Sequence, residues 1–532
     1  MICMARWLQG FRRGIQVMRI PVTGCGSVGT TAPEAGIAFT GQPTTRYRKP
    51  ATWIPVVAWL GIIFLFAPRA RAQILETEYS QRRAAVAERM RDGFLILPGA
   101  PEPARDYLDF AQEPNFFYLT GIDEPGAAIV LVKHGSTHSA MLFVQPRDPA
   151  REVWSGFRLG TDGATERTGL PARTMSGLDA FVDSITAAHD LAYVPRDQRE
   201  LTARLRALKP SMSFLGIDAF MRGLRGTKSP AELDLLRKAI AITVDAQLAA
   251  MRSISPGMNE FEIEALIEYT FRRNGADRPA FATIVGSGPN STTLHYNRND
   301  RFMHAGELVV MDIGASYRGY AGDVTRTVPV SGVFSPEQRA VYQLVRDAQA
   351  AGERAAQPGA NSMAMNIAVD SVIKHGLAAL GLTESPDAVY DCGNAERAMT
   401  CPQFRLYYMH GLGHGIGLDV HDPGTSGIQP GTLAPGDAFS IEPGVYVRGN
   451  LLEIIRASPR NDAMKTRIAA AVRRYANTGV RIEDDYIVTA SGVEWASPAP
   501  REIGEIEAVM RVRAPVPRDP VKIDWYRATG GS

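Results

Sequence analysis

The sequence predicts an α+β fold preceded by a smaller α/β domain, and three observations lead to this prediction. Capped helices begin at Ser229, Asn259 and Ser335, because each of these residues is followed three positions later by Glu or Gln. Apolar runs rich in β-branched residues lie between these helices and are typical of antiparallel strands. Earlier in the chain, short apolar strands alternate with helical segments. We therefore expect an α/β domain first, and then a sheet covered on one side by helices.

The first part of the chain predicts export. An apolar run over residues 53–67 follows basic residues at 46, 48 and 49 and ends in Ala70-Arg71-Ala72. A basic region, a short apolar core and a small-x-small exit describe a secretory signal peptide. The run is shorter than the roughly 20 apolar residues of a membrane-spanning helix. We expect cleavage after Ala72 and an exported, periplasmic protein; the alternative is an anchor formed by residues 53–67, the sole membrane contact.

Charge and cysteine content narrow the possibilities further. The formal net charge is only +2 and no basic run follows the leader, so a nucleic-acid partner is not indicated. Beyond the leader the cysteines are Cys392 and Cys401. In an oxidising compartment this pair is a candidate disulfide that would stiffen the loop leading to His410, and two buried free thiols are the alternative.

The segment from about residue 73 predicts an α/β domain without a cluster of His, Cys and carboxylates. Residues 77–93 have helical spacing and end at a glycine. Short apolar runs predict strands at 94–97, 116–121, 127–132, 141–144, 192–194 and 213–217. We expect this domain to contribute to substrate gating or to oligomer contacts.

A hairpin over residues 311–327 organises the C-terminal part. Two apolar, β-branched arms flank Tyr317-Arg318-Gly319, so Asp312 and Asp323 fall at mirrored places on neighbouring strands. Two carboxylates at that range repel each other unless a proton or a cation lies between them. A shared metal is one interpretation, and two aspartates that cap turns and face water are the other.

Further candidate ligands follow in the sequence. His410, His414 and His421 lie within one Gly-rich stretch, and imidazole is a common metal ligand. Glu442 ends an apolar strand, and Glu483 lies inside a strand pattern. An acid that faces the core is rarely left unpaired. Four carboxylates and one imidazole suit two divalent ions of the manganese, cobalt or zinc kind.

The order of these residues resembles a known family. The motifs DxG…GYxxDxTRT, HGxGHxxGLDVHD, IEPG and RIEDD are similar to those of the pita-bread metallopeptidases, and within them to aminopeptidase P and prolidase. The resemblance covers roughly residues 76–497. It implies five metal ligands: Asp312, Asp323, His414, Glu442 and Glu483. It also implies site-lining histidines at His295, His410 and His421, an arginine beside the last ligand at Arg481, and a proton-shuttling role for Glu442.

The resemblance also implies the architecture. We expect a C-terminal pita-bread domain of the creatinase/aminopeptidase type and an N-terminal creatinase-like α/β domain. The expected boundaries are a leader at 1–72, the N-terminal domain at 73–227, the catalytic domain at 228–500 and a tail at 501–532. Residues 449–477 read as an insertion that is helical around 463–475.

The activity implied is hydrolysis of the bond before a proline at the second position of a peptide, by a hydroxide held between two metal ions. Manganese is the first choice of metal, with cobalt or zinc as alternatives. An Xaa-Pro aminopeptidase is the first hypothesis, because the N-terminal domain resembles that of aminopeptidase P. Prolidase is the second, and a catalytically dead pita-bread binding module is the third. We also expect a homo-oligomer, either a dimer or a tetramer.

Overall fold

The computed structural model describes residues 73–105, 109–394, 397–424 and 431–528. The predicted signal peptide and its alternative, an anchor at 53–67, lie outside these residues. Within the described part of the chain, no helix is long and apolar enough to cross a membrane.

The N-terminal domain is built on one mixed sheet with the strand order β4-β3-β2-β1-β5-β6. β1 pairs antiparallel with β2 and parallel with β5, so the centre of the sheet joins a meander to parallel strands. The strands are β1 (Gly93–Pro98), β2 (Ala128–His134), β3 (Thr137–Val144), β4 (Ala172–Thr174), β5 (Leu191–Val194) and β6 (Ser213–Gly216).

Helices pack on both faces of this sheet. Alternate residues of β1 face opposite sides, so Leu95 and Leu97 join one apolar cluster while Phe94 and Ile96 join another. The first cluster lies under α1, α2, α4 and α7, and the second under α5 and α6. The helices are α1 (Glu76–Arg89), α2 (Pro114–Thr120), α3 (Pro149–Ser155), α4 (Gly160–Thr168), α5 (Leu178–Ala188), α6 (Arg199–Leu208) and α7 (Asp218–Arg225).

One predicted strand of this domain is wrong. Residues 116–121 belong to helix α2 and its C-cap. The side chain of Glu113 caps the helix by accepting from the backbone N–H of Phe116, and Pro114 occupies the first turn. Gly121 ends the helix with a left-handed φ of 64°. The aromatic run resembles a strand in composition, but the capping residues on both sides decide for a helix.

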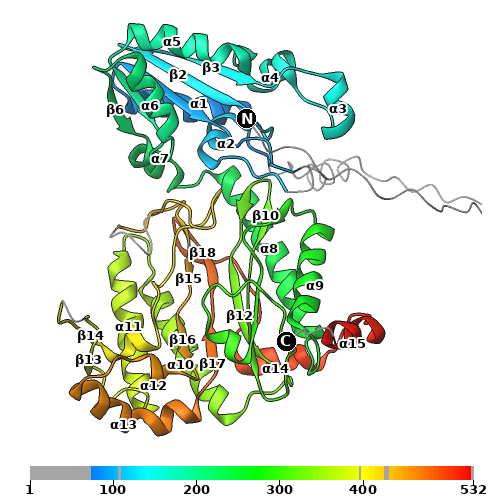
Figure 1. Ribbon diagram of the computed structural model, residues 1–532, viewed down its shortest axis with the longest axis vertical. Helices are drawn as coiled ribbons and strands as arrows, with labels where there is room; N and C mark the ends of the chain where they lie inside the picture. The colour runs from blue at the N-terminus through cyan, green and yellow to red at the C-terminus, as the bar shows by residue number, and fades with distance from the viewer. Residues whose placement is uncertain (1–72, 106–108, 395–396, 425–430, 529–532) are drawn as a thin grey trace, which may run out of the picture. The chain divides into compact units, whose positions relative to one another are not determined.

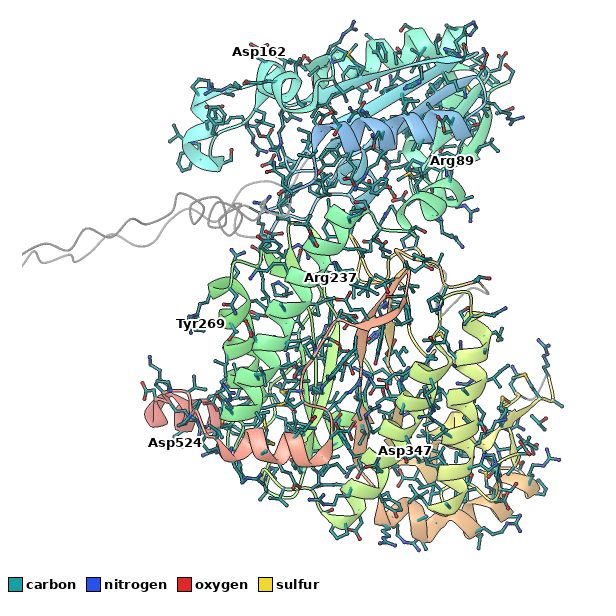
Figure 2. All side chains as sticks on the ribbon, turned by 180° about the vertical axis from the view of Figure 1, so that it is seen from behind. Arg89, Asp162, Arg237, Tyr269, Asp347 and Asp524 are labelled. Atoms are coloured by element: carbon teal, nitrogen blue, oxygen red, sulfur yellow. A yellow bond between two sulfur atoms is a disulfide. The ribbon has the colours of Figure 1, made fainter. Side chains whose placement is uncertain are left out.

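The C-terminal domain begins at the predicted capped helix. Ser229, Asn259 and Ser335 each form a complete capping box, as expected. The four long helices pack as two pairs, with α8–α9 beside β12 and α10–α11 beside β15 (Figure 1). They are α8 (Pro230–Ser253), α9 (Glu260–Arg273), α10 (Pro336–Ala355) and α11 (Ser362–Ala379). Tyr269 and Asp347 lie on the outward sides of α9 and α10 (Figure 2).

Short strands make up several small sheets between these helices. The orders are β12-β9-β8, β11-β10-β7, β15-β18-β19, β16-β17 and β13-β14. The bounds are β7 (Arg278–Pro279), β8 (Ile284–Ser287), β9 (Leu308–Ile313), β10 (Ala315–Tyr317), β11 (Tyr320–Ala321), β12 (Val324–Pro329), β13 (Val389–Asp391), β14 (Thr400–Pro402), β15 (Ala438–Ile441), β16 (Gly444–Val447), β17 (Thr478–Arg481), β18 (Asp484–Thr489) and β19 (Gly492–Trp495).

The predicted hairpin is present. β9 pairs antiparallel with β12, and β10 continues the arm to a pairing of Tyr317 with Tyr320. The turn between these residues holds Arg318 at a φ of 51° and Gly319 at a φ of 83°. Two successive left-handed residues match the twist of a two-residue hairpin turn. The register of the hairpin is thus fixed at its tip.

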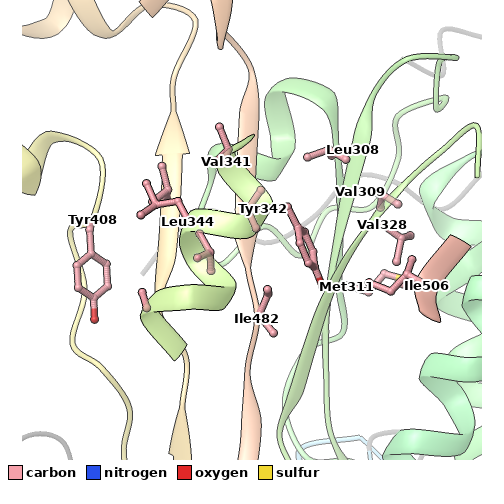
Figure 3. Close-up of a cluster of buried hydrophobic side chains, with 14 of the residues drawn as sticks. Leu308, Val309, Met311, Val328, Val341, Tyr342, Leu344, Tyr408, Ile482 and Ile506 are labelled. Atoms are coloured by element: carbon pink, nitrogen blue, oxygen red, sulfur yellow. The ribbon is translucent and has the colours of Figure 1, made fainter. Parts of the chain in front are cut away.

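The main core of this domain lies between the strands and the helices (Figure 3). Val309 and Met311 from β9 meet Tyr342 and Val341 from α10 in one apolar cluster. The cluster also takes in Ile506 of α14 (Ile503–Arg511). The segment 501–532, which the sequence predicts to be a tail, therefore contributes to the core. It also contains α15 (Pro520–Ala528).

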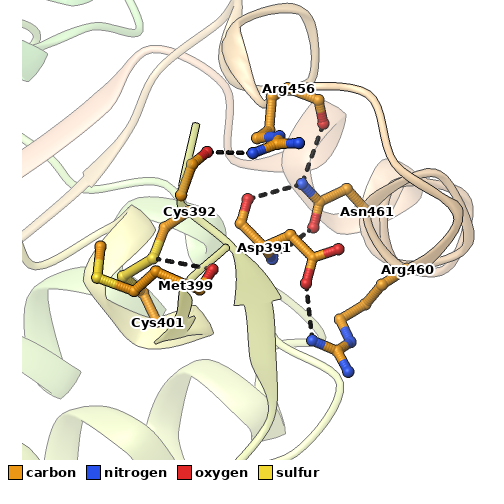
Figure 4. Close-up of a disulfide and its surroundings, with 8 residues drawn as sticks. Asp391, Cys392, Met399, Cys401, Arg456, Arg460 and Asn461 are labelled. Atoms are coloured by element: carbon orange, nitrogen blue, oxygen red, sulfur yellow. Dashed lines mark hydrogen bonds and ion pairs between the residues drawn. A yellow bond between two sulfur atoms is a disulfide. The ribbon is translucent and has the colours of Figure 1, made fainter. Parts of the chain in front are cut away.

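The predicted disulfide joins Cys392 and Cys401 across the β13–β14 hairpin (Figure 4). The hairpin is attached to the segment 449–477, which folds as α12 (Leu451–Ile454) and α13 (Pro459–Arg474). Asp391 accepts from the Ser458 hydroxyl at 2.7 Å and from Arg460 at 2.7 Å. The predicted helix is thus longer than the sequence indicated, because the Ser458 side chain caps it.

Candidate metal centre

Breaks between strands position three of the predicted ligands. Asp323 lies between β11 and β12, Glu442 between β15 and β16, and Glu483 between β17 and β18. Asp312 instead lies within β9, paired with Thr325 of β12. His414 lies within the Gly-rich stretch, and its backbone carbonyl accepts from the N–H of Ser440 in β15 at 2.8 Å. Five segments far apart in sequence therefore meet at one place.

The side chains of these residues converge. The Nε2 atom of His414 lies 3.5 Å from Asp323 Oδ2, 3.7 Å from Glu442 Oε1 and 3.9 Å from Glu483 Oε1. One ligand atom each from Asp323, His414 and Glu483 lie within 4.8 Å of one another. These three residues and Asp312 are buried. The geometry is that of a compact, largely dry cluster of acids around one imidazole.

Burial and repulsion between neighbouring carboxylates raise the pKa values of acids in the cluster. Burial raises the pKa of Asp323 well above its usual range, and the charge of Glu483 adds to this effect. The pKa of Glu483 rises for the same reasons, burial first and the charge of Glu442 second. Burial also raises the pKa of Glu442 to about 8. Burial lowers the pKa of His414 to about 4, so the imidazole is neutral at physiological pH and free to act as a ligand.

The residues present fit a cation. Asp312 Oδ1, Asp323 Oδ1 and Glu483 Oε1 are buried and lack a hydrogen-bond partner within the described part of the chain. A buried polar atom without a partner carries a large desolvation cost, and a charged one costs more. Divalent cations bound here would be coordinated by these oxygens and would neutralise the repulsion among the acids. An imidazole with several carboxylates is a donor set that suits manganese, cobalt or zinc.

Neighbouring side chains hold the proposed ligands in place through hydrogen bonds and an ion pair. Arg481 is buried, and its Nη2 lies 2.5 Å from Asp312 Oδ2. Its Nη1 donates to the Tyr446 hydroxyl at 2.9 Å, and that hydroxyl lies 2.8 Å from His410 Nε2. Thr325 donates its hydroxyl to Glu483 Oε2 at 2.8 Å. Sequence reasoning assigned no role to Tyr446, which carries no signal beyond its place in an apolar strand, or to Thr325, which lies within the quoted DxTRT motif.

The three predicted site-lining histidines differ in their surroundings. His410 lies against the cluster, with Nδ1 3.8 Å from Glu442 Oε2, and burial lowers its pKa to about 3. The ring of His421 is exposed and lies 4.2 Å, centroid to centroid, from the ring of His414. His295 is exposed in a turn beside Leu294, whose carbonyl accepts from Arg481 at 3.3 Å. The structure thus places His410 and His421 directly beside proposed ligands. His295 instead lies next to Leu294, the residue that Arg481 contacts.

Comparison with known proteins finds matches for both domains. Residues 234–490 match metallopeptidase family M24, and residues 79–193 match the aminopeptidase P N-terminal domain. The chain is 34% identical to an Xaa-Pro aminopeptidase of Escherichia coli (strain K12) over 465 residues, 82% of this chain and 98% of the relative. A human Xaa-Pro dipeptidase is 30% identical over 502 residues, 85% of this chain and 95% of the relative.

A solved structure is similar in three dimensions. Zinc-substituted E. coli aminopeptidase P in complex with product superimposes with a TM-score of 0.71 at 31% sequence identity. The match covers 83% of this chain and 100% of the other.

Proposed function

Since this chain belongs to metallopeptidase family M24 and carries an aminopeptidase P N-terminal domain, we propose that it removes the N-terminal residue from peptides whose second residue is proline. The chain is a metallo-exopeptidase with a C-terminal pita-bread domain, and the match to Xaa-Pro aminopeptidases over 98% of their length supports this specificity. The single observation that carries the proposal is the mostly buried cluster of four acids and one histidine, in which three carboxylate oxygens have no hydrogen-bond partner within the described residues.

The ligand set would be Asp312, Asp323, His414, Glu442 and Glu483, and two divalent cations bound there would supply Lewis acidity and a lowered pKa for the attacking water. Manganese is our first choice because most of the ligand atoms are carboxylate oxygens, and cobalt or zinc are alternatives. Inductively coupled plasma mass spectrometry of the purified protein identifies the ion, and a different native metal would overturn only this choice.

The chain's own residues divide the remaining work of hydrolysis. Glu442 is proposed to take a proton from the attacking water and give it to the leaving nitrogen, and its Oε1 lies 3.7 Å from His414 Nε2 within the cluster. The proposal gives His410, His421 and His295 the role of lining the substrate site and stabilising the developing oxyanion. Arg481 stays charged, and its bonds to Asp312 and Tyr446 fix the position of that ligand and, through Tyr446, of His410.

Two rival functions remain to be separated by assay. Prolidase has support from the match to a human Xaa-Pro dipeptidase. Aminopeptidase activity predicts cleavage of Ala-Pro-Ala with little cleavage of Ala-Pro, whereas a prolidase gives the reverse. Ala-Ala-Ala is the control for proline dependence. A protein that cleaves none of these peptides with either manganese, cobalt or zinc would support the third reading, a binding module.

We also propose that the protein is exported to the periplasm after cleavage at Ala72, with an anchor at 53–67 as the alternative. N-terminal sequencing of protein from the periplasmic fraction should begin at Gln73, and a product that retains residues 53–67 would contradict cleavage.

A homo-oligomer, a dimer or tetramer, is proposed as well. Val153, Trp154 and Phe157 support it, because these large apolar side chains on and just after α3 are mostly exposed. Light scattering at several concentrations tests this, and a monomer throughout would contradict it.

A further inference from the structure

Arg225 connects the N-terminal domain to the loop that carries His421. It is the last residue of α7, and its Nη1 donates to Asn115 Oδ1 of α2 at 2.7 Å. Its Nη2 donates to Asp419 Oδ2 at 2.7 Å and also to Asp422 Oδ1. His421 lies between these two aspartates in the chain. One guanidinium therefore holds both sides of the short segment from which His421 projects.

Three of the four charged side chains in this contact are buried, and Asp419 is partly exposed. The side chains of Arg225, Lys228 and Asp422 are 4%, 1% and 1% exposed, and Lys228 Nζ lies 3.1 Å from Asp422 Oδ2. Burial alone would raise the pKa of Asp422, but the charges of Lys228 and Arg225 outweigh it and lower that pKa. A buried ion pair has a strict geometry, because displacement leaves an uncompensated charge in a dry environment.

The Asp422 carboxylate also folds the loop itself. Asp422 Oδ1 accepts the backbone N–H of Asp419 at 3.1 Å, and the N–H of Asp422 donates to the carbonyl of Gly415 at 2.8 Å. A Cβ on Gly417 would come within 2.6 Å of Asp422 Oδ2, so the carboxylate is packed directly against the backbone of the loop. The orientation of Asp422 and the path of residues 417–422 are therefore set together.

We propose that Arg225 is a positioning residue for His421, so that the N-terminal domain sets the position of a histidine in the catalytic domain. Without the guanidinium, Asp422 keeps Lys228 but loses its contact to α7, and Asp419 loses its bond to the same group. The segment between them is then free to shift, while Asp312 in β9 and the acids in the breaks before β12, β16 and β18 keep their own supports, and His414 keeps its backbone bond to Ser440. This inference rests on the proposed role of His421 in peptide hydrolysis.

The test compares Arg225→Gln with the conservative Arg225→Lys and with a matched control, Arg82→Gln. Arg82 is also buried and also joins the two domains, since its Nη2 lies 3.1 Å from Glu232 Oε2 of α8, but it does not touch the His421 loop. We expect Arg225→Gln to lower kcat on Ala-Pro-Ala by about 10–100-fold, since small misplacements of this kind can cost about 100-fold. KM and metal content should change little, Arg225→Lys should recover part of the rate, and Arg82→Gln should keep the wild-type kcat at a temperature where it is folded.

A double-mutant cycle with His421→Ala separates this inference from the proposed function. If Arg225 acts through His421, Arg225→Gln should cost almost nothing once His421 is absent. An equal cost in both backgrounds would overturn the inference, as would loss of metal in Arg225→Gln or an equal loss of kcat in Arg82→Gln. Failure of the proposed function would show differently, as a wild-type protein that does not cleave Ala-Pro-Ala at all.

Discussion

Glu483 and Asp484 are adjacent in the chain and both are buried, yet their carboxylates have opposite surroundings. Asp484 accepts from Arg326 at 2.6 Å and from Arg501 at 3.0 Å, and three further donors complete it: Gln349, Trp495 and Ser497. Glu483 accepts one hydrogen bond, from the hydroxyl of Thr325, and its Oε1 has none within the described residues.

The pKa values follow this difference. Burial alone would raise the pKa of Asp484, but Arg326 and Arg501 outweigh it and lower that pKa. Burial and neighbouring acids raise the pKa of Glu483 well above its usual range. The comparison indicates that the fold can fully pair a buried carboxylate and does so one residue away from the cluster. Within the described residues, Asp312, Asp323 and Glu483 each keep an unpaired carboxylate oxygen at the site, as does Asp485 next to it, and cations best explain such a concentration.

The largest effect should come from the unpaired acid. Glu483→Gln removes one charged ligand while keeping its size, so it should abolish most metal binding and nearly all peptidase activity. Asp312→Asn and His414→Ala should act in the same way. The folding stability of the metal-free protein should hold or rise, because repulsion among the acids decreases. Metal content by mass spectrometry and thermal unfolding in chelator check both parts, and wild-type metal content in Glu483→Gln would contradict them.

The matched change one residue later should have the opposite profile. Asp484→Asn leaves Arg326 and Arg501 without their buried counter-charge, and breaking such a pair typically costs about 3–5 kcal/mol. Metal content per folded molecule should stay near the wild-type value. Denaturant unfolding gives the free energy, and a stability loss under about 1 kcal/mol would show that the network is not the rigid support described here.

The dependence of stability on metal and pH should distinguish the acid cluster from the paired carboxylate of Asp484 in the same protein. In chelator, Glu442 holds a proton in the folded state up to about pH 8, while in the unfolded chain it releases it near its ordinary value of 4.5. The contribution of Glu442 to stability is therefore present below pH 4.5 and is lost as the pH rises to about 8. The contribution of Asp484 has the opposite dependence, because it is lost only as the pH falls below the ordinary aspartate pKa of 3.8.

Added metal should remove this alkaline loss. Free metal at about 1,000 times its Kd stabilises the folded state by about 4 kcal/mol. Thermal unfolding of chelated and metal-loaded protein at pH 5 and pH 8 measures the effect, which is expected to be larger at pH 8. An equal gain at both values would count against the cluster as its source.

The disulfide lies outside both charge clusters and should have the smallest effect. It closes a loop with a sequence separation of 9 between Cys392 and Cys401. Chain-entropy arguments give roughly 2–3 kcal/mol for a loop of this size. Reduction should lower the melting temperature and leave metal content unchanged, and any loss of activity should be smaller than that caused by Glu483→Gln. Thiol titration of unfolded, unreduced protein should find no free thiol from this pair.

Local signals in the sequence predicted much of the fold. The capping boxes at Ser229, Asn259 and Ser335 identified three long helices, because a capping box is determined by residue types within four consecutive positions. The turn at Arg318-Gly319 identified the hairpin in the same way. The helix at 114–120 was missed, because aromatic content was weighed above the cap at Glu113 and the proline that follows it.

The candidate site was likewise predictable only where local motifs identify its residues. The five proposed ligands could be named from motifs, and the structure brings them together. The partners that distinguish Glu483 from Asp484 could not be named, because Arg326 and Thr325 lie 158 positions away along the chain. Likewise, nothing near Arg225 indicates a partner 197 positions later at Asp422. Such pairs are set by tertiary packing, which a single sequence does not display.

The central claim is that the unpaired acids hold two divalent ions that the peptidase activity requires. The most direct test is to titrate chelated, inactive protein with manganese while measuring bound metal and the rate on Ala-Pro-Ala in the same samples. We predict two ions bound per chain, activity that returns with them, and neither effect in Glu483→Gln. Full activity without bound metal, or two ions bound equally by Glu483→Gln, would contradict the claim.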